Sequence, residues 1–181
     1  ALLANHSAFL SSVVLSNSTL TFSNWNTTLS ATDLTVGVSG IMTLPGPFTT
    51  SQMSNSIVLV CTNLSILSGG LIRADTNGYA GGAGSDGYGP GKGLFGNRGG
   101  GGAHGGRAGD GYYNSTIFLG GASNGVPHAP CLPGSSGASD NVIRRGGAGG
   151  GVIVITAAVV NVEGILSAHG GNGDSQCGGG A

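Results

Sequence analysis

The chain has 181 residues, only 7% of them are charged, and the formal net charge is −1. Nucleic-acid binding needs a concentrated surface of lysine and arginine. This chain has six such residues in total, so we expect no nucleic-acid partner. No stretch approaches the about 20 apolar residues that a membrane-spanning helix requires, so we expect no membrane span either.

Strands are expected rather than helices along the whole chain. The straight-chain residues that normally cover helix surfaces are missing, because the sequence has a single glutamate and a single lysine. Residues 1–50 are predicted to be a β-rich, sequon-rich N-terminal segment, with loose apolar alternation over residues 13–29. Its apolar start, residues 1–15, is a candidate strand for donation to a neighbouring molecule.

Three further segments look like copies of one unit, namely residues 34–42, 64–72 and 160–168. Each has apolar residues at alternate positions, then a turn that ends in glycine, then two apolar residues. Period-2 alternation is typical of a strand with one buried face. The shared glycine marks either a positive φ or a lack of room for a Cβ atom. Residues 57–62 and 152–156 are nearly continuous apolar runs, which are typical of strands buried on both faces.

Short strands that recur and turn at glycine predict an all-β fold, a parallel β-helix-like solenoid whose coils stack on one another. The alternative is an antiparallel β-sandwich. The solenoid segment is expected over residues 51–181, with glycine-rich insertions at about 78–111 and 120–151. Because aromatic residues recur in these insertions, we expect ordered polyglycine or polyproline-II-like layers packed against the solenoid.

Five Asn-X-Ser/Thr sequons predict an N-glycosylated protein of the cell surface or the extracellular space. Glycans would also keep a chain with so few charges soluble. Chance occurrence in a chain rich in serine, threonine and asparagine is the alternative. The sequon asparagines are Asn5, Asn17, Asn26, Asn63 and Asn114.

The three cysteines lack the CxxC spacing of a structural zinc site. In an oxidising compartment, one disulfide and one odd thiol are expected. Cys131 and Cys177 are the candidate pair, because both lie in glycine-rich, turn-like sequence. Cys61 follows an apolar run and is expected to be a free buried thiol or an intermolecular one.

One calcium site is a candidate, because residues 81–88 fit the Gly-Gly-x-Gly-x-Asp-x-U pattern of calcium-binding β-rolls, with Asp86 as the acid. Such rolls bind the ion between tandem copies, and residues 170–174 only approximate a second copy. An aspartate in a glycine turn is therefore favoured, and no cofactor is expected. The sequence also offers no clear pair of carboxylates for glycosidase chemistry, so we expect no enzyme activity.

Three glycine-rich elements carry a resemblance to a known family. They are residues 99–106, residues 130–137, and residues 146–155 running on to 164–171. Together they look like the glycine-rich, pectin-lyase-like β-helix segments of large cell-surface proteins in plants, protists and some bacteria. The chain is also similar in character to glycosylated extracellular fibril subunits. These resemblances imply a β-helix outside the cell, and neither family brings a catalytic site to transfer.

The predicted function is structural. The chain stops in a glycine run without a polar capping repeat, and such an open end is complementary to the open start of another copy. A head-to-tail contact of this kind builds filaments when it does not close into a ring. We expect a subunit of an N-glycosylated extracellular filament whose partner is itself. The alternative is a carbohydrate- or surface-binding module of a larger cell-surface adhesin.

Overall fold

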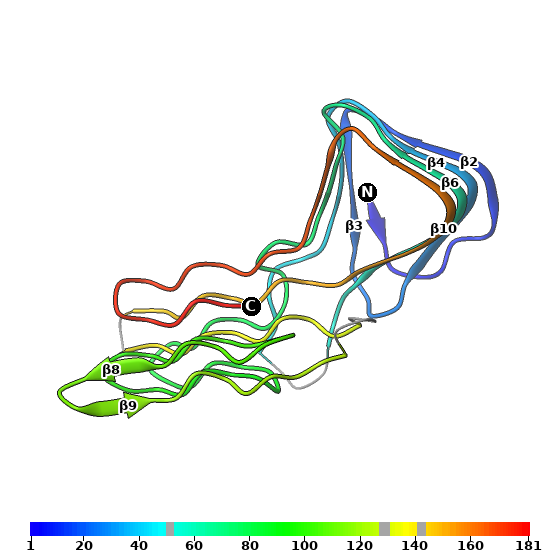
Figure 1. Cartoon of the computed structure of the whole chain (residues 1–181). Helices are drawn as coiled ribbons and strands as arrows, with labels where there is room; N and C mark the ends of the chain where they lie inside the picture. The colour runs from blue at the N-terminus through cyan, green and yellow to red at the C-terminus, as the bar shows by residue number, and fades with distance from the viewer. Residues whose placement is uncertain (50–52, 127–130, 141–143) are drawn as a thin grey trace. The chain divides into compact units, whose positions relative to one another are not determined.

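The computed structural model describes residues 1–49, 53–126, 131–140 and 144–181 (Figure 1). Within these ranges the regular elements are β-strands, and no helix is present. The chain divides into two compact units. Unit 1 comprises Ala1–Pro45, Ser54–Ala74 and Ile153–Ser167. Unit 2 comprises Gly46–Met53, Asp75–Val152 and Ala168–Ala181.

Unit 1 contains two open sheets in which every strand pair is parallel. The order in sheet A is β1 (Leu2–Leu3), β3 (Ser18–Phe22), β5 (Gly40–Thr43), β7 (Leu71–Arg73) and β11 (Ile165–Ser167). The order in sheet B is β10 (Ile153–Val162), β6 (Ile57–Ile66), β4 (Thr28–Val36) and β2 (Leu10–Leu15), which lie side by side in Figure 1. Successive strands of unit 1 alternate between the two sheets.

The three predicted repeats lie on adjacent strands in the register that their sequences suggest. Leu64 pairs with Leu34 on one side and with Val160 on the other. Leu71 pairs in the same way with Ile41 and Ile165. The repeat prediction is therefore confirmed at the level of single residues.

The shared glycine of the repeats is required by space. A Cβ atom at Gly40 would fall on the carbonyl of Leu15, and one at Gly70 would fall on the carbonyl of Val36. None of the three repeat glycines, Gly40, Gly70 and Gly164, has a positive φ. Of the two reasons offered by the sequence, the lack of room for a side chain is the correct one.

The core of unit 1 lies between the inner faces of the two sheets. Strand β6 alternates between buried and more exposed residues, so only one of its faces is fully buried. Strand β10 is mostly exposed, since it lies at the edge of sheet B. The prediction that both apolar runs are buried on both faces is therefore wrong. The largest fully buried apolar side chains of unit 1 are Phe22, Leu34, Val36, Met42, Ile57, Leu59, Leu64, Ile66 and Ile72.

The predicted parallel β-helix-like solenoid is wrong. The strands of unit 1 form two separate open sheets, and the described part of the chain contains no closed or solenoid sheet. The antiparallel sandwich is wrong too, because all pairs in both sheets are parallel. Repeats in the sequence indicate which residues become neighbours, but they do not determine whether the paired strands close on themselves.

Unit 2 holds most of the glycine-rich sequence. Its paired strands are β8 (Gly111–Tyr113) and β9 (Thr116–Phe118), which form an antiparallel hairpin (Figure 1). Asn114 and Ser115 form its two-residue turn, and both have a positive φ, as a type I′ turn demands.

Most of unit 2 is held together by backbone hydrogen bonds between extended segments. Gly149 is typical: its N–H donates to the Tyr79 carbonyl at 2.8 Å, and its own carbonyl accepts from the Gly78 N–H at 2.8 Å. A Cβ atom at Gly149 would collide with the backbone of Gly134. The predicted layers packed against a solenoid do not exist in that form, because no solenoid forms and the glycine-rich sequence makes a unit of its own.

Candidate functional site

Each sheet of unit 1 has two open edges, and the outermost strands come from the two ends of the strand sequence. Strands β1 and β2 are outermost on one side, and we call them the early edge. Strands β10 and β11 are outermost on the other side, and we call them the late edge. An outermost strand has backbone N–H and C=O groups without a partner strand, so it is a template for pairing with another chain.

At the late edge, apolar side chains on the core-facing side of sheet B are exposed. Val160 and Val162 lie beside Leu64 and Ile66 of β6, on the same face of sheet B. Leu64 and Ile66 are completely buried, whereas Val160 is 50% exposed and Val162 is 46% exposed. The hydrophobic core is therefore uncovered at the late edge.

The early edge is apolar as well. Leu2 and Val14 are exposed, and so is Phe9, which directly precedes β2. Residues 1–15, predicted as a strand to be donated, pair within their own chain: β1 with β3, and β2 with β4. This segment therefore forms the outer border of its own sheets.

Both edges lack charged side chains and prolines, two of the devices that normally prevent strand pairing. Edge strands of monomeric proteins carry charged side chains, prolines or bulges that block a partner. The four outermost strands contain no charged residue and no proline. The two edges are therefore suited to association, and they form the candidate functional site.

The sequon asparagines lie on accessible parts of the chain. Asn5, Asn17, Asn26 and Asn114 are exposed, and the last three of these have a positive φ, which is typical of tight turns. Asn63 is half-buried in β6, and its side-chain amide donates to Asp33 Oδ1 at 2.7 Å. The four exposed positions have room for a bulky glycan.

The three cysteines are free thiols in the structure, so the Cys131–Cys177 disulfide is not formed in it. Cys61 is buried in β6, and burial raises the pKa of its thiol. Cys131 is exposed. Cys177 is half-buried, and its Sγ lies 3.5 Å from Asp140 Oδ1.

Asp86, the calcium candidate, has other partners. Its carboxylate accepts from Lys92 Nζ at 2.9 Å and from the Phe95 N–H at 2.9 Å. The hydrogen bond from Lys92, followed by that from the Phe95 amide, holds the pKa of this carboxyl below its usual range. Among the described residues, no group of three or more His, Cys, Asp or Glu side chains is placed to hold a metal ion. Asp86 therefore lies in a local ion pair in this structure.

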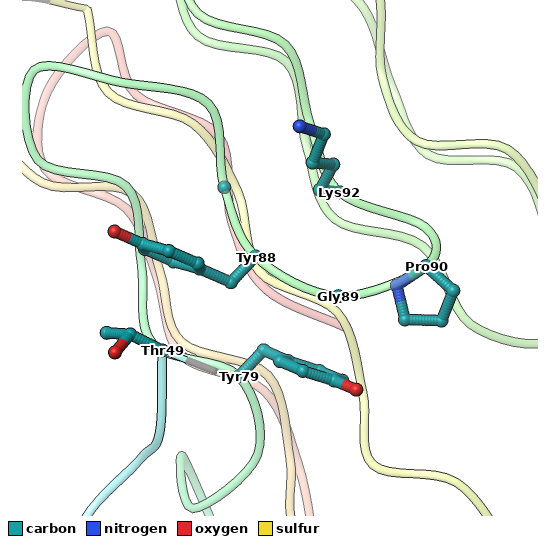
Figure 2. A pocket seen from close by; sticks show the side chains of 7 residues that line it. Thr49, Tyr79, Tyr88, Gly89, Pro90 and Lys92 are labelled. Carbon is teal, nitrogen blue, oxygen red and sulfur yellow. The ribbon is translucent and has the colours of Figure 1, made fainter. Parts of the chain in front are cut away.

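Unit 2 has a hollow of about 560 Å³ that the sequence did not indicate. Two tyrosines, Tyr79 and Tyr88, line it together with Thr49, Pro90 and Lys92, and Figure 2 shows the two phenol hydroxyls pointing in opposite directions. The Tyr79 ring packs edge-on against Phe48, with ring centroids 4.8 Å apart. Burial raises the pKa of the Tyr79 hydroxyl. The lining is mainly apolar, and its one lysine, Lys92, is already paired with Asp86.

Comparison with protein-family models, with curated proteins and with solved structures finds no match to this chain. Over the described residues, there is no helix long and apolar enough to cross a membrane. The functional conclusions therefore rest on the sequence and on the geometry of the two units.

Proposed function

We propose that this chain is a structural subunit of an N-glycosylated extracellular assembly, in which copies join through the open edges of unit 1. One observation carries the proposal: Val160 and Val162 are aligned with fully buried core residues, yet they are about half exposed. Covering such side chains removes apolar surface from water and favours association by roughly 25 cal/mol per Å².

The two edges differ, and this decides the kind of assembly. A contact between the late edge of one copy and the early edge of the next uses two different surfaces, so it leaves a free surface at each end. Such heterologous contacts add copies without limit unless their rotation closes a ring. Because all strands of both sheets are parallel, the added copy continues the sheets in the same direction. The expected product is a filament.

Glycosylation is the second half of the proposal. The chain has few charges, and an uncharged surface favours non-specific association. Glycans on Asn17, Asn26 and Asn114 would occupy exposed turns rather than the outermost strands. They would keep the remaining surface soluble while the edges stay free to pair.

The test is the state of the chain after secretion from a eukaryotic host. We expect negative-stain microscopy and sedimentation velocity to show elongated oligomers that grow with protein concentration. We also expect the intact mass to exceed the sequence mass and to fall after treatment with an N-glycosidase. A monodisperse single-chain particle at all concentrations would refute the self-association, and an unmodified mass would refute the glycosylation.

The hollow of unit 2 supports a second candidate function, which is binding of an uncharged saccharide. Sugars stack their C–H faces on aromatic rings, and the Tyr88 ring, which lines the hollow, offers an apolar face for such a contact. Lys92 is neutralised by Asp86 at 2.9 Å, which favours an uncharged ligand over an acidic one.

Replacing Tyr88 by alanine should weaken saccharide binding by on the order of tenfold, because the loss of one ring face removes about 1.4 kcal/mol. Tyr112→Ala is the matched control, since Tyr112 is an exposed tyrosine of β8 outside the hollow. Calorimetric titration with neutral oligosaccharides measures both variants. If neither the parent chain nor the Tyr112→Ala chain binds any of them, this second function is excluded.

A further inference from the structure

The four strands of sheet B share one irregular pattern of inward-facing residues. In β6 the buried positions Cys61, Leu64 and Ile66 are separated by three residues and then by two. Strand β4 has the same spacing at Ala31, Leu34 and Val36. The aligned residues are Ala157, Val160 and Val162 in β10, and Leu10, Val13 and Leu15 in β2.

The pairing between strands is interrupted at the same place in each ladder. The paired residues skip Thr62 of β6 and its neighbours in the adjacent strands: Thr32 in β4 and Ala158 in β10. Ser11 is skipped in the same way in β2. A strand with regular alternation can slip by two residues and still present its apolar face to the core. A strand with this irregular spacing cannot, because only one register brings all three apolar positions and the interruption into line.

Each set of aligned residues forms a column across the sheet. The central column consists of Val13, Leu34, Leu64 and Val160. Its inner members, Leu34 and Leu64, are buried, and the core is uncovered beside its last member, Val160. An apolar side chain of about the size of Val13 would extend this column beyond Val160. A second copy of the chain carries such a side chain, its own Val13, on its early edge.

We propose that β2 of a second copy pairs in parallel with β10, with Val13 beside Val160 and Leu15 beside Val162. This inference rests on the proposed self-association and adds its register. The occupant is a second copy because the early edge repeats the spacing of the late edge, runs in the same direction and, like it, carries no charge. The same step in sheet A places Leu2 of the second copy beside Ser167.

A pair of introduced cysteines tests the register. Val14 and Asn161 lie in one outward-facing column, and both are exposed. In the proposed register, they are neighbours on adjacent strands about 4.8 Å apart, within the Cα–Cα range of a disulfide. The matched control joins Ser12→Cys to Asn161→Cys. Ser12 shares the column of Val159, two residues away, so its Cα is about 8 Å from that of Asn161, too far for a disulfide.

Both double variants are made in the full chain with Cys131→Ser and Cys177→Ser, and Cys61 is kept because it is buried. We expect oxidation of the Val14→Cys/Asn161→Cys chain to give a ladder of disulfide-linked oligomers on a non-reducing gel, at least about tenfold faster than the control. Sedimentation velocity before oxidation reports assembly independently.

If the chains assemble but the control pair crosslinks as fast or faster, the register is wrong and the self-association stands. If neither variant nor the parent chain assembles, the proposed function and the register both fail. A chain with Asn161→Cys alone is expected to give linked dimers at most, which separates a true ladder from random collision.

Discussion

A lysine in place of Val160 is expected to abolish self-association while leaving the chain folded. In the single chain this side chain is 50% exposed, so the lysine ammonium can extend into water. In the proposed assembly, the same position would be enclosed between Leu64 and the early edge of the next copy. Burying an unpaired charge costs several kcal/mol, so the dissociation constant should rise by at least about a hundredfold.

Thr156→Lys is the matched control. Thr156 is on the same strand, but it is exposed. Its sequence neighbours Ile155 and Ala157 face the core and pack against it, so Thr156 lies on the outer face. The control therefore adds the same charge to the same edge on the outer face, and it should assemble like the parent chain. Sedimentation velocity measures both variants, and circular dichroism verifies their strand content. Assembly of Val160→Lys at parental concentrations would show that the late edge is not the contact.

Sequence reasoning succeeded where the same short pattern recurs along the chain, because the copies pair with one another. The spacing around Gly40 and Gly70 was enough to identify the repeats, and the structure places Leu34, Leu64 and Val160 in one row. The glycines were informative because a neighbouring carbonyl occupies the space of the missing side chain. A position that only glycine can occupy is therefore more informative than a position that accepts several residue types.

The same reasoning failed where the outcome depends on what lies beyond the strand. The apolar residues 152–156 resemble 57–62, yet β6 lies between two strands and β10 has a neighbour on one side only. The residues of β10 do not by themselves show whether it is a central strand or an edge strand with one free side. For this reason the uncovered core at Val160 and Val162, the main element of the candidate site, could be recognised only in the structure.

The hollow of unit 2 could not be predicted for a different reason. Tyr79 and Tyr88 belong to glycine-rich sequence without periodicity, so no pattern indicates on which side of the backbone each ring lies. Their positions depend on long-range backbone hydrogen bonds, such as those from Tyr79 N–H to the Gly134 carbonyl and from Ser136 N–H to the Tyr88 carbonyl. Contacts between distant residues of this kind leave no signal in neighbouring sequence.

Replacing Gly149 by alanine is expected to destabilise unit 2 strongly. The added Cβ would fall on the backbone carbonyl of Gly134, and a backbone atom cannot rotate away as a side chain does. The two segments must separate, which strains the hydrogen bonds of Gly149 to Tyr79 and Gly78. Overpacking typically costs about 1–3 kcal/mol, and we expect the upper end of that range, which lowers Tm by roughly 10 °C.

The chain itself provides a probe for this measurement and a control. All four tyrosines belong to unit 2 and the single tryptophan, Trp25, belongs to unit 1, so tyrosine circular dichroism and tryptophan fluorescence follow the units separately. Gly105→Ala adds the same methyl group where nothing lies within 4 Å, and it should change stability by no more than about 0.5 kcal/mol. The tyrosine transition should shift for Gly149→Ala and stay in place for Gly105→Ala. Equal stability of both variants would mean that the extended segments are not packed backbone against backbone, and that glycine is abundant in unit 2 for some reason other than space.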